Sequence, residues 1–296
     1  MSQKVLVTGA GGQLGQELIR SAPPEFDCVG VDRSMLDIGD PKAVVALLRR
    51  EKPQLVVNAA AYTAVDKAES EPTLARRVNA LGPANLAQAC LELNTRLVHV
   101  STDFVFDGES SSPYCPSDIP APVGEYGRGK LEGEREVLAV LPNALIVRTG
   151  WVYSRFGSNF VKTMLRLMTE RDELSVVADQ VGTPTWASGL AKAIWAASSH
   201  PALGGIYHWS DAGVCSWYDF ALAINEEACA IGLLGRATKI KPIPARDYPT
   251  PARRPAYSVL DKEKSWKDFQ IEGVHWRRQL RAMLQELLPD HKEKNT

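Results

Sequence analysis

Tyr126 and Lys130 stand four residues apart, a spacing that places a phenol and an ammonium one turn apart on the same face of a helix. Such a pair suits the reduction of a ketone, which needs a proton as the hydride arrives. A phenol with a pKa of about 10 releases its proton slowly at neutral pH, and a neighbouring cation favours the phenolate. We therefore expect Tyr126 to donate the proton and Lys130 to activate it.

A tyrosine and a lysine four residues apart also occur by chance, so the residues around this pair are stronger evidence for a catalytic role than its spacing. Among the eight tyrosines only Tyr126 has a lysine at that distance, and it follows an apolar run, 97–101, that predicts a buried strand. Open α/β sheets bind ligands at the carboxyl ends of their strands, so Thr102 could donate to the substrate carbonyl. Gly127 and Gly129 each lower helix propensity by about 1 kcal/mol relative to alanine, which indicates that something packs closely against this turn.

A glycine-rich turn lies near the amino terminus, between a strand-like run, 5–7, and a helical pattern, 13–21. Gly9, Gly12 and Gly15 would let the backbone turn tightly and approach a pyrophosphate, with the amides at the helix start facing the anion. A glycine triplet alone is a weak signal. Its position after a strand and before a helix, at the start of an alternating pattern, favours dinucleotide binding over a plain structural turn.

Residues that follow the second and third predicted strands could hold the rest of a dinucleotide. Asp32 ends the second strand, where an acid would accept hydrogen bonds from the adenosine ribose. Arg33 follows directly and could instead meet a 2′-phosphate, so NADPH and NADH both stay open as the cofactor. Asp37 and Ile38 lie in the next loop, where they could flank the adenine. Small residues at 58–61 would let the dinucleotide lie flat over the sheet edge.

The elements that must position these residues alternate along the first half of the chain. Short, continuously apolar strands separated by helices are typical of a parallel sheet buried on both faces, and right-handed crossovers then give a doubly wound sheet. The fold class is therefore α/β and Rossmann-like, with a smaller C-terminal substrate-binding lobe. The predicted strands cover residues 5–7, 28–31, 55–58, 97–101 and 144–148, and the predicted helices cover 13–21, 41–51, 71–93 and 126–140.

Two regions follow from this pattern. Residues 1–150 predict an NAD(P)-binding Rossmann domain. Beyond residue 150 the alternation loosens and tryptophans and prolines become frequent. Residues 151–296 therefore predict mainly a substrate-binding lobe, with some elements returning to the Rossmann sheet.

Composition excludes several classes of protein. The net charge is -1 with both signs interspersed, which argues against a nucleic-acid binder. No run approaches the roughly 18 apolar residues of a membrane span, and no secretory signal is present, so we expect no membrane association. The five cysteines are widely spaced without a CxxC, as expected for reduced thiols in a cytoplasmic protein. The five histidines form no HxxxH or HExxH pattern, so no metal site is predicted.

Six motifs together resemble the dTDP-4-dehydrorhamnose reductases, a family of extended short-chain dehydrogenases. In chain order they are TGAGGQLG, VNAAAYTAVDKAE, STDFVFDG, YGRGKLEGE, RTGWVY and PTPARRPAYS. The resemblance covers roughly residues 4 to 285, and the combination is far more specific than any single motif. It implies an NAD(P)H-dependent reduction of the C4 ketone of dTDP-4-dehydro-β-L-rhamnose to dTDP-L-rhamnose, the last step of dTDP-rhamnose biosynthesis.

The resemblance also implies roles for individual residues. Tyr126 would be the proton donor, Lys130 its activator and a ribose anchor, and Thr102 the hydroxyl that orients the carbonyl. Asp103 and Trp151 would contact the sugar; without the resemblance Trp151 reads as a core residue. The family's cofactor positions fall on Gly12, Gln13, Leu14, Asp32, Asp37, Ile38, Ala61, Tyr62 and Thr63.

Some positions match the family less clearly. Arg253 and Arg254 fit its nucleotide-diphosphate region and could each pair with phosphate oxygens, the alternative being two exposed arginines in a proline-rich loop. Tyr257 stands where family members commonly have asparagine. Some relatives form dimers bridged by magnesium through acidic side chains; Glu17 could serve such a site, but Ser188 stands where a second acid would be expected. We predict no metal, and a homodimer stays open.

Two other functions remain as alternatives at this point. An epimerase or dehydratase acting on another nucleotide sugar would use the same fold. A regulatory subunit, such as the relative of this family that binds a methionine adenosyltransferase, would need no catalysis. The intact set of Thr102, Tyr126 and Lys130 favours an enzyme over such a subunit.

Overall fold

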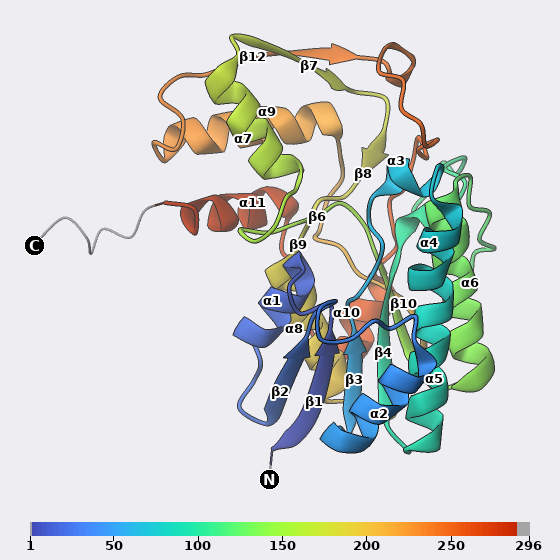
Figure 1. Ribbon diagram of the computed structural model, residues 1–296. Coiled ribbons are helices and arrows are strands. Elements are labelled where there is room, and N and C mark those ends of the chain that lie inside the picture. Colours follow the sequence, from blue (N-terminus) through green and yellow to red (C-terminus); the bar gives the residue numbers. More distant parts are fainter. Residues whose placement is uncertain (1, 289–296) are drawn as a thin grey trace, which may run out of the picture.

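The computed structural model describes residues 2–288, and a six-stranded parallel sheet forms its centre (Figure 1). The strand order β10-β5-β4-β3-β1-β2 confirms the predicted doubly wound α/β fold. The strands are β1 (Gln3–Thr8), β2 (Phe26–Val31), β3 (Leu55–Asn58), β4 (Arg96–Thr102), β5 (Leu145–Thr149) and β10 (Gly205–His208).

Helices cover both faces of the sheet, as continuously apolar strands require (Figure 1). Alternate residues of β1 separate the two cores: Val5 and Val7 pack toward α1 and α8, and Leu6 packs toward the opposite helices. The helices on the first face are α1 (Gln13–Arg20) and α8 (Ala187–Ser198), and those on the second are α2 (Pro41–Glu51), α5 (Gly82–Glu92) and α6 (Glu125–Val140).

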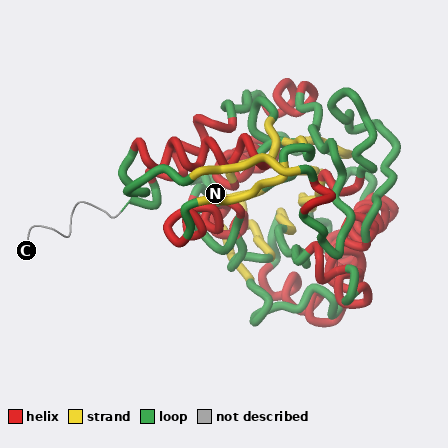
Figure 2. Tube along the Cα trace, turned by 90° about the horizontal axis from the view of Figure 1, so that it is seen from above, coloured by secondary structure: helices red, strands yellow, loops and turns green. Residues whose placement is uncertain are grey.

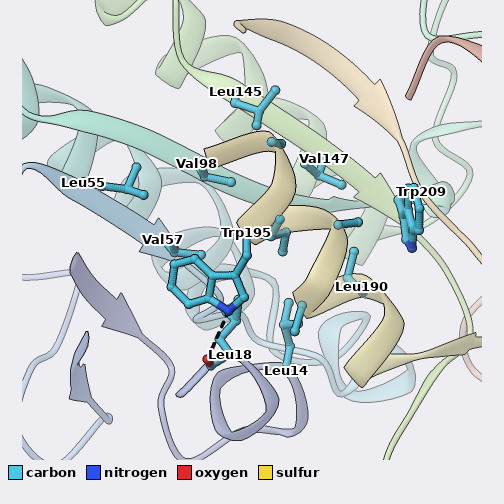
Figure 3. Packing of buried hydrophobic residues seen from close by; sticks show 14 of the residues in the cluster. Leu14, Leu18, Leu55, Val57, Val98, Leu145, Val147, Leu190, Trp195 and Trp209 are labelled. Atoms are coloured by element: carbon cyan, nitrogen blue, oxygen red, sulfur yellow. Dashed lines mark hydrogen bonds between the residues drawn. The ribbon is translucent and has the colours of Figure 1, made fainter. Parts of the chain in front are cut away.

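Trp195 ties α8 to α1 in the first of these cores (Figure 3). Its indole N–H donates to the backbone oxygen of Leu18 at 3.2 Å, which satisfies the polar atom of a buried tryptophan. The ring also stacks on Phe26 with centroids 4.9 Å apart. A helix from the second half of the chain is thus built into the sheet region.

The predicted helix at 71–93 is interrupted. It consists of α4 (Pro72–Arg76), a π-helical turn (Arg77–Leu81) and α5. Pro83 has no N–H to bond the carbonyl of Asn79, so the helical hydrogen bonding shifts at this point. Gly133 of α6 packs against that same carbonyl, where a Cβ atom would come within 2.2 Å of it.

The second half of the chain builds a smaller lobe around its own apolar cluster. Figure 2 looks down on this lobe, whose strands cross in front of the sheet. A short helix, α10 (Glu263–Phe269), returns to pack beside β10. The elements of the lobe are α7 (Phe160–Glu170), α9 (Trp217–Ala230), α11 (Trp276–Gln285), the parallel pair β7 (Glu173–Val177) and β12 (Lys239–Ile243), and the two-residue strands β6 (Val152–Tyr153), β8 (Val181–Gly182), β9 (Thr185–Trp186) and β11 (Cys215–Ser216). Within residues 2–288, no helix combines the length and the hydropathy needed to cross a bilayer.

Candidate active site

A cavity of about 1120 Å³ runs along the carboxyl ends of β1 to β5 and reaches α7 and α9 of the smaller lobe. It gathers nearly all of the residues that the sequence singled out. Those lining it are Gly9, Gly12, Gln13, Leu14, Asp32, Arg33, Asp37, Ile38, Ala61, Tyr62, Thr63, Thr102, Asp103, Tyr126, Lys130, Trp151 and Arg254. Gly15 and Arg253 do not line it.

The glycine turn brings the backbone of β1 and α1 against the end of β3. Gly9 has φ +71°, and a Cβ atom there would lie 2.6 Å from the amide nitrogen of Ala60. Gly15 has a packing role, because its Cβ would lie 2.2 Å from the carbonyl oxygen of Gly9. Gly12 is the N-cap of α1, and no side chain in the described residues caps that helix start. The first-turn amides are therefore available to an anion in the cavity.

The region assigned to adenosine contains two acids that are already hydrogen-bonded. Asp32 accepts bonds from the backbone and hydroxyl of Ser34 at 2.8 and 2.6 Å, which lower the pKa of its carboxyl. Asp37 forms an ion pair with Arg77 at 2.6 Å. Arg77 also lines the cavity, and sequence reasoning missed it because it lies within a predicted helix with no motif around it.

Lys130 and Tyr126 come together on the first turns of α6. Lys130 is almost fully buried, and its Nζ donates to the backbone oxygen of Val100 at 2.7 Å. Burial lowers the pKa of Lys130 to about 8. Burial also raises the pKa of Tyr126 to about 12, with the charge of Asp103 adding to the rise and a hydrogen bond from Thr102 opposing it.

The pKa of Tyr126 is thus shifted against the direction expected from a neighbouring lysine, and the charge of Lys130 is not among the causes; the activation of Tyr126 by Lys130 stays a prediction. The pKa of the phenol lies above its usual value instead of below it. The physical reason is that the apolar surroundings disfavour the phenolate, while the lysine proton is bonded to a strand carbonyl. At neutral pH the phenol consequently keeps its proton, which is the form that a proton donor needs.

Thr102 and Asp103 form a hydroxyl–carboxylate pair at the end of β4. Thr102 Oγ1 donates to Asp103 Oδ1 at 3.1 Å, whereas Asp103 Oδ2 is buried and, within residues 2–288, no donor meets full hydrogen-bond geometry with it, the Ser258 hydroxyl being the other one near this carboxylate. Burial raises the pKa of Asp103 to about 6, against the hydrogen bonds of nearby hydroxyls. Gly150 is required opposite it, because a Cβ there would lie 2.5 Å from Oδ2. An unpaired buried oxygen beside a cavity indicates a ligand that donates to it.

A row of buried polar side chains crosses three strands beneath Lys130. Thr8 Oγ1 donates to Asn58 Oδ1 at 2.7 Å, and Asn58 Nδ2 lies 3.0 Å from His99 Nδ1. Asn58 Oδ1 also accepts from the amide of Ala60 at 3.2 Å, which fixes the loop after β3 against the cavity. Burial and the charge of Lys130 hold the pKa of His99 well below its usual value. The sequence analysis did not identify this row, although Thr8 and Asn58 each end an apolar strand; His99 lies inside β4 and has no such signal.

The far end of the cavity carries aromatic and charged side chains. Trp151 lies face to face with Trp217, with centroids 3.5 Å apart. Arg254 forms a two-pronged ion pair with Asp66 at 3.0 and 2.8 Å. Arg253 is exposed and lies outside the cavity, so only one of the two predicted phosphate contacts faces it.

Glu17, the acid considered for a metal site, is already bonded to other side chains of the chain. Glu17 is fully buried and accepts from Ser154 at 2.7 Å and from Arg20 at 2.7 Å. In the part of the chain that the structure describes, no group of three or more His, Cys, Asp or Glu side chains could hold a metal ion. The absence of a metal stays a prediction.

A doubly wound sheet, a glycine turn at its first strand and a tyrosine–lysine pair facing one cavity define a dinucleotide-dependent oxidoreductase of the short-chain dehydrogenase class. The chain matches the RmlD substrate binding domain family over residues 3–288 and belongs to it. The resemblance inferred from the motifs is confirmed.

Relatives match over nearly their whole length. A dTDP-4-dehydrorhamnose reductase of Aggregatibacter actinomycetemcomitans is 42% identical over 285 residues, covering 94% of this chain and 97% of the relative. A probable dTDP-4,6-dihydroxy-2-methyloxan-3-one 4-ketoreductase of Streptomyces antibioticus is 41% identical, covering 96% of this chain and 94% of the relative. The crystal structure of a dTDP-4-dehydrorhamnose reductase from Bacillus anthracis, in complex with NADP, has a TM-score of 0.91 at 36% identity and covers 97% of this chain and 100% of its own.

Proposed function

We propose that this chain reduces the C4 ketone of dTDP-4-dehydro-β-L-rhamnose to dTDP-L-rhamnose with NADPH or NADH, the last step of dTDP-rhamnose biosynthesis. The observation that carries the proposal is the single cavity that joins the glycine turn, the Tyr126–Lys130 pair and Arg254. Relatives named for this reaction, matched over the whole chain, support it.

The dinucleotide, when bound, supplies the hydride that adds to the ketone carbon. Tyr126 gives its proton to the ketone oxygen, and Thr102 turns its one hydroxyl proton from Asp103 to this oxygen and so orients it. Lys130 holds the ribose hydroxyls beside the nicotinamide, and Asp103 Oδ2 accepts from a sugar hydroxyl. The ammonium of Lys130 is buried, whereas the partly exposed Tyr126 lines the cavity, so a bound substrate that displaces water there would strengthen the interactions of both groups.

The same cavity offers a contact for each cofactor. We assign the 2′-phosphate of NADPH to the exposed Arg33 and the adenosine ribose to Asp32. The NADP complex of the Bacillus anthracis relative supports NADPH as one reductant. Arg33→Ala should weaken NADPH binding about 10-fold and leave NADH binding within about twofold, measured by fluorescence titration. Equal losses for both cofactors would place the phosphate elsewhere.

The proposal also includes four expectations from the sequence: the class of substrate, the arginines that contact it, the cellular location and the division into two regions. The nucleotide sugar is the substrate, Arg253 is retained as a weaker diphosphate contact than Arg254, and the protein acts in the cytoplasm. The division into a Rossmann domain at 1–150 and a substrate-binding lobe at 151–296 is also proposed.

The test is a stoichiometric assay. With dTDP-4-dehydro-β-L-rhamnose, one NADPH should be oxidised for each sugar reduced, followed by absorbance and by product analysis. An epimerase or dehydratase of the same fold recycles its cofactor, so turnover without net NADPH oxidation would overturn the proposal. Binding to a methionine adenosyltransferase without turnover would instead indicate the regulatory alternative. The comparison substrate in this assay is dTDP-4,6-dihydroxy-2-methyloxan-3-one, the keto-sugar for which the Streptomyces antibioticus relative is named.

A further inference from the structure

Two indoles lie flat against each other where the sheet meets the smaller lobe. Trp151 follows β5, and Trp217 is the first residue of α9; their ring centroids are 3.5 Å apart and their planes differ by 4°. Both side chains line the cavity. Trp217 is therefore one of the residues of the smaller lobe that line the cavity beside Trp151.

Trp151 has a backbone conformation that it would not adopt alone. Its φ is +51°, in the left-handed region that disfavours residues with a side chain. The surroundings must hold it there. Its carbonyl oxygen accepts from the amide of Thr185 at 3.1 Å, and Gly182 packs so closely that a Cβ would lie 2.6 Å from the indole Cε2. The stack on Trp217 covers one face of the ring, which also packs against the apolar cluster of the smaller lobe.

Trp217 is itself rigidly placed. The helix start beside it is closed by a reciprocal capping box, in which Ser216 Oγ accepts from the amide of Asp219 at 3.1 Å and Asp219 accepts from the amide of Ser216 at 2.9 Å. Phe160 lies against the indole with centroids 4.6 Å apart. Because Trp217 is held in place by these contacts, its stacked ring can in turn hold the indole of Trp151 in one orientation.

We infer that Trp217 is a positioning residue for sugar recognition: it holds Trp151 in the orientation that packs the apolar side of a 6-deoxyhexose. This inference rests on the proposed function. Because Trp217 covers one face of Trp151, the rest of that indole is left for the C–H surfaces of a sugar that lacks one hydroxyl, and the dinucleotide contacts assigned above lie on other elements. Loss of Trp217 should therefore weaken the sugar contact and spare the cofactor contacts.

The experiment compares three variants of the full chain: Trp217→Ala, Trp217→Phe and, as a matched control, Trp266→Phe, which removes an indole outside the cavity. The quantities measured are KM for the nucleotide sugar, kcat, Kd for NADPH and the melting temperature. For Trp217→Ala, KM should rise about 5–10-fold while the Kd for NADPH stays within about twofold. Trp217→Phe keeps a flat ring and should recover most of the loss, and Trp266→Phe should leave KM unchanged.

The outcomes separate the inference from the function. If wild type oxidises NADPH with the keto-sugar but Trp217→Ala leaves KM unchanged, the inference is wrong and the proposed function stands. Equal weakening of sugar and NADPH binding would indicate a merely structural role and would also overturn it. If wild type shows no sugar-dependent oxidation, the proposed function fails first. Should Trp217→Ala not fold, Trp217→Leu against Trp217→Phe decides the same question, since only the second keeps the stack.

Discussion

The ammonium of Lys130 is bonded to the backbone oxygen of Val100 at 2.7 Å, so the cation is fixed to β4 before any ligand enters. Burial lowers the pKa of Lys130 to about 8. The free protein therefore holds the charged form below about pH 8 and loses it above. We expect kcat/KM to fall above about pH 8, whereas Tyr126, with its raised pKa, keeps its proton over the same range.

Lys130→Arg provides the control for this pH profile. Arginine stays protonated at every accessible pH, so any residual activity of the variant should be flat between about pH 7 and 9. A decline at the same pH in the variant would assign the titration to another group.

Tyr126→Phe should abolish most of the turnover. Phenylalanine keeps the ring that packs edge-on against Phe104 but cannot give up a proton. We expect kcat to fall by about 10²–10⁴-fold and the Kd for NADPH to stay within about twofold, from steady-state kinetics and fluorescence titration. Survival of turnover would mean that another group protonates the ketone oxygen.

Asp103→Asn should make the protein more stable and less able to bind the sugar. The pKa of Asp103 is raised from 3.8 to about 6, so the folded chain binds more protons than the unfolded chain between these values. Stability that is fully present below about pH 4 is therefore lost as pH rises through about 6. At pH 7 the buried carboxylate costs on the order of 2–3 kcal/mol, which the amide avoids.

Urea unfolding at pH 4, 5, 6 and 7 measures this effect. The difference between Asp103→Asn and wild type should be small at pH 4 and grow through pH 6. A difference that does not change with pH would show that the carboxyl does not titrate in this window.

Arg254 and Arg253 are adjacent in sequence, and only one of them faces the cavity. Arg254→Ala should raise KM for the nucleotide sugar about 10-fold or more, because a charge-assisted hydrogen bond to a diphosphate is lost. Arg253→Ala should change KM by less than about twofold. Equal effects of both variants would show that the loop rearranges when the substrate binds.

Gly127 and Gly129 form a matched pair on one helix. A Cβ atom at Gly127 would lie 2.2 Å from the carbonyl oxygen of Phe104, whereas one at Gly129 meets nothing closer than 3.6 Å. Gly127→Ala should therefore lower the free energy of unfolding by about 1–3 kcal/mol. Gly129→Ala should be neutral or stabilise by up to about 1 kcal/mol through helix propensity. Urea denaturation of both variants tests this order.

The parts of the site that depend on local spacing could be predicted from the sequence. The glycine turn and the Tyr126–Lys130 pair are of this kind, since four residues of helix or one turn after a strand fix their geometry. The strands of the sheet could also be predicted, because each one is a short, continuous run of apolar residues. The π-helical interruption around Asn79 could have been predicted from Pro83, but the apolar pattern on both sides of it favoured one continuous helix.

Other parts depend on contacts between distant segments. Asp66 meets Arg254 across 188 residues of sequence, and Trp217 at the start of α9 meets Trp151, which follows β5. Neither carries a local motif. The direction of the Tyr126 pKa shift was predicted wrongly because it depends on burial, which a spacing rule does not contain. Gly129 shows the same limit: the close packing expected there occurs at Gly127 instead.

The outermost strand of the sheet has a consequence for how the chain is made. β10 pairs with β5, yet residues 150–204 are synthesised between them. During translation the open edge of β5 stays without its neighbour until residue 208 has left the ribosome. Because unpaired strand edges associate readily with other chains, we expect the nascent protein to be prone to aggregation until β10 is complete. Truncations that end before β10 should accordingly aggregate.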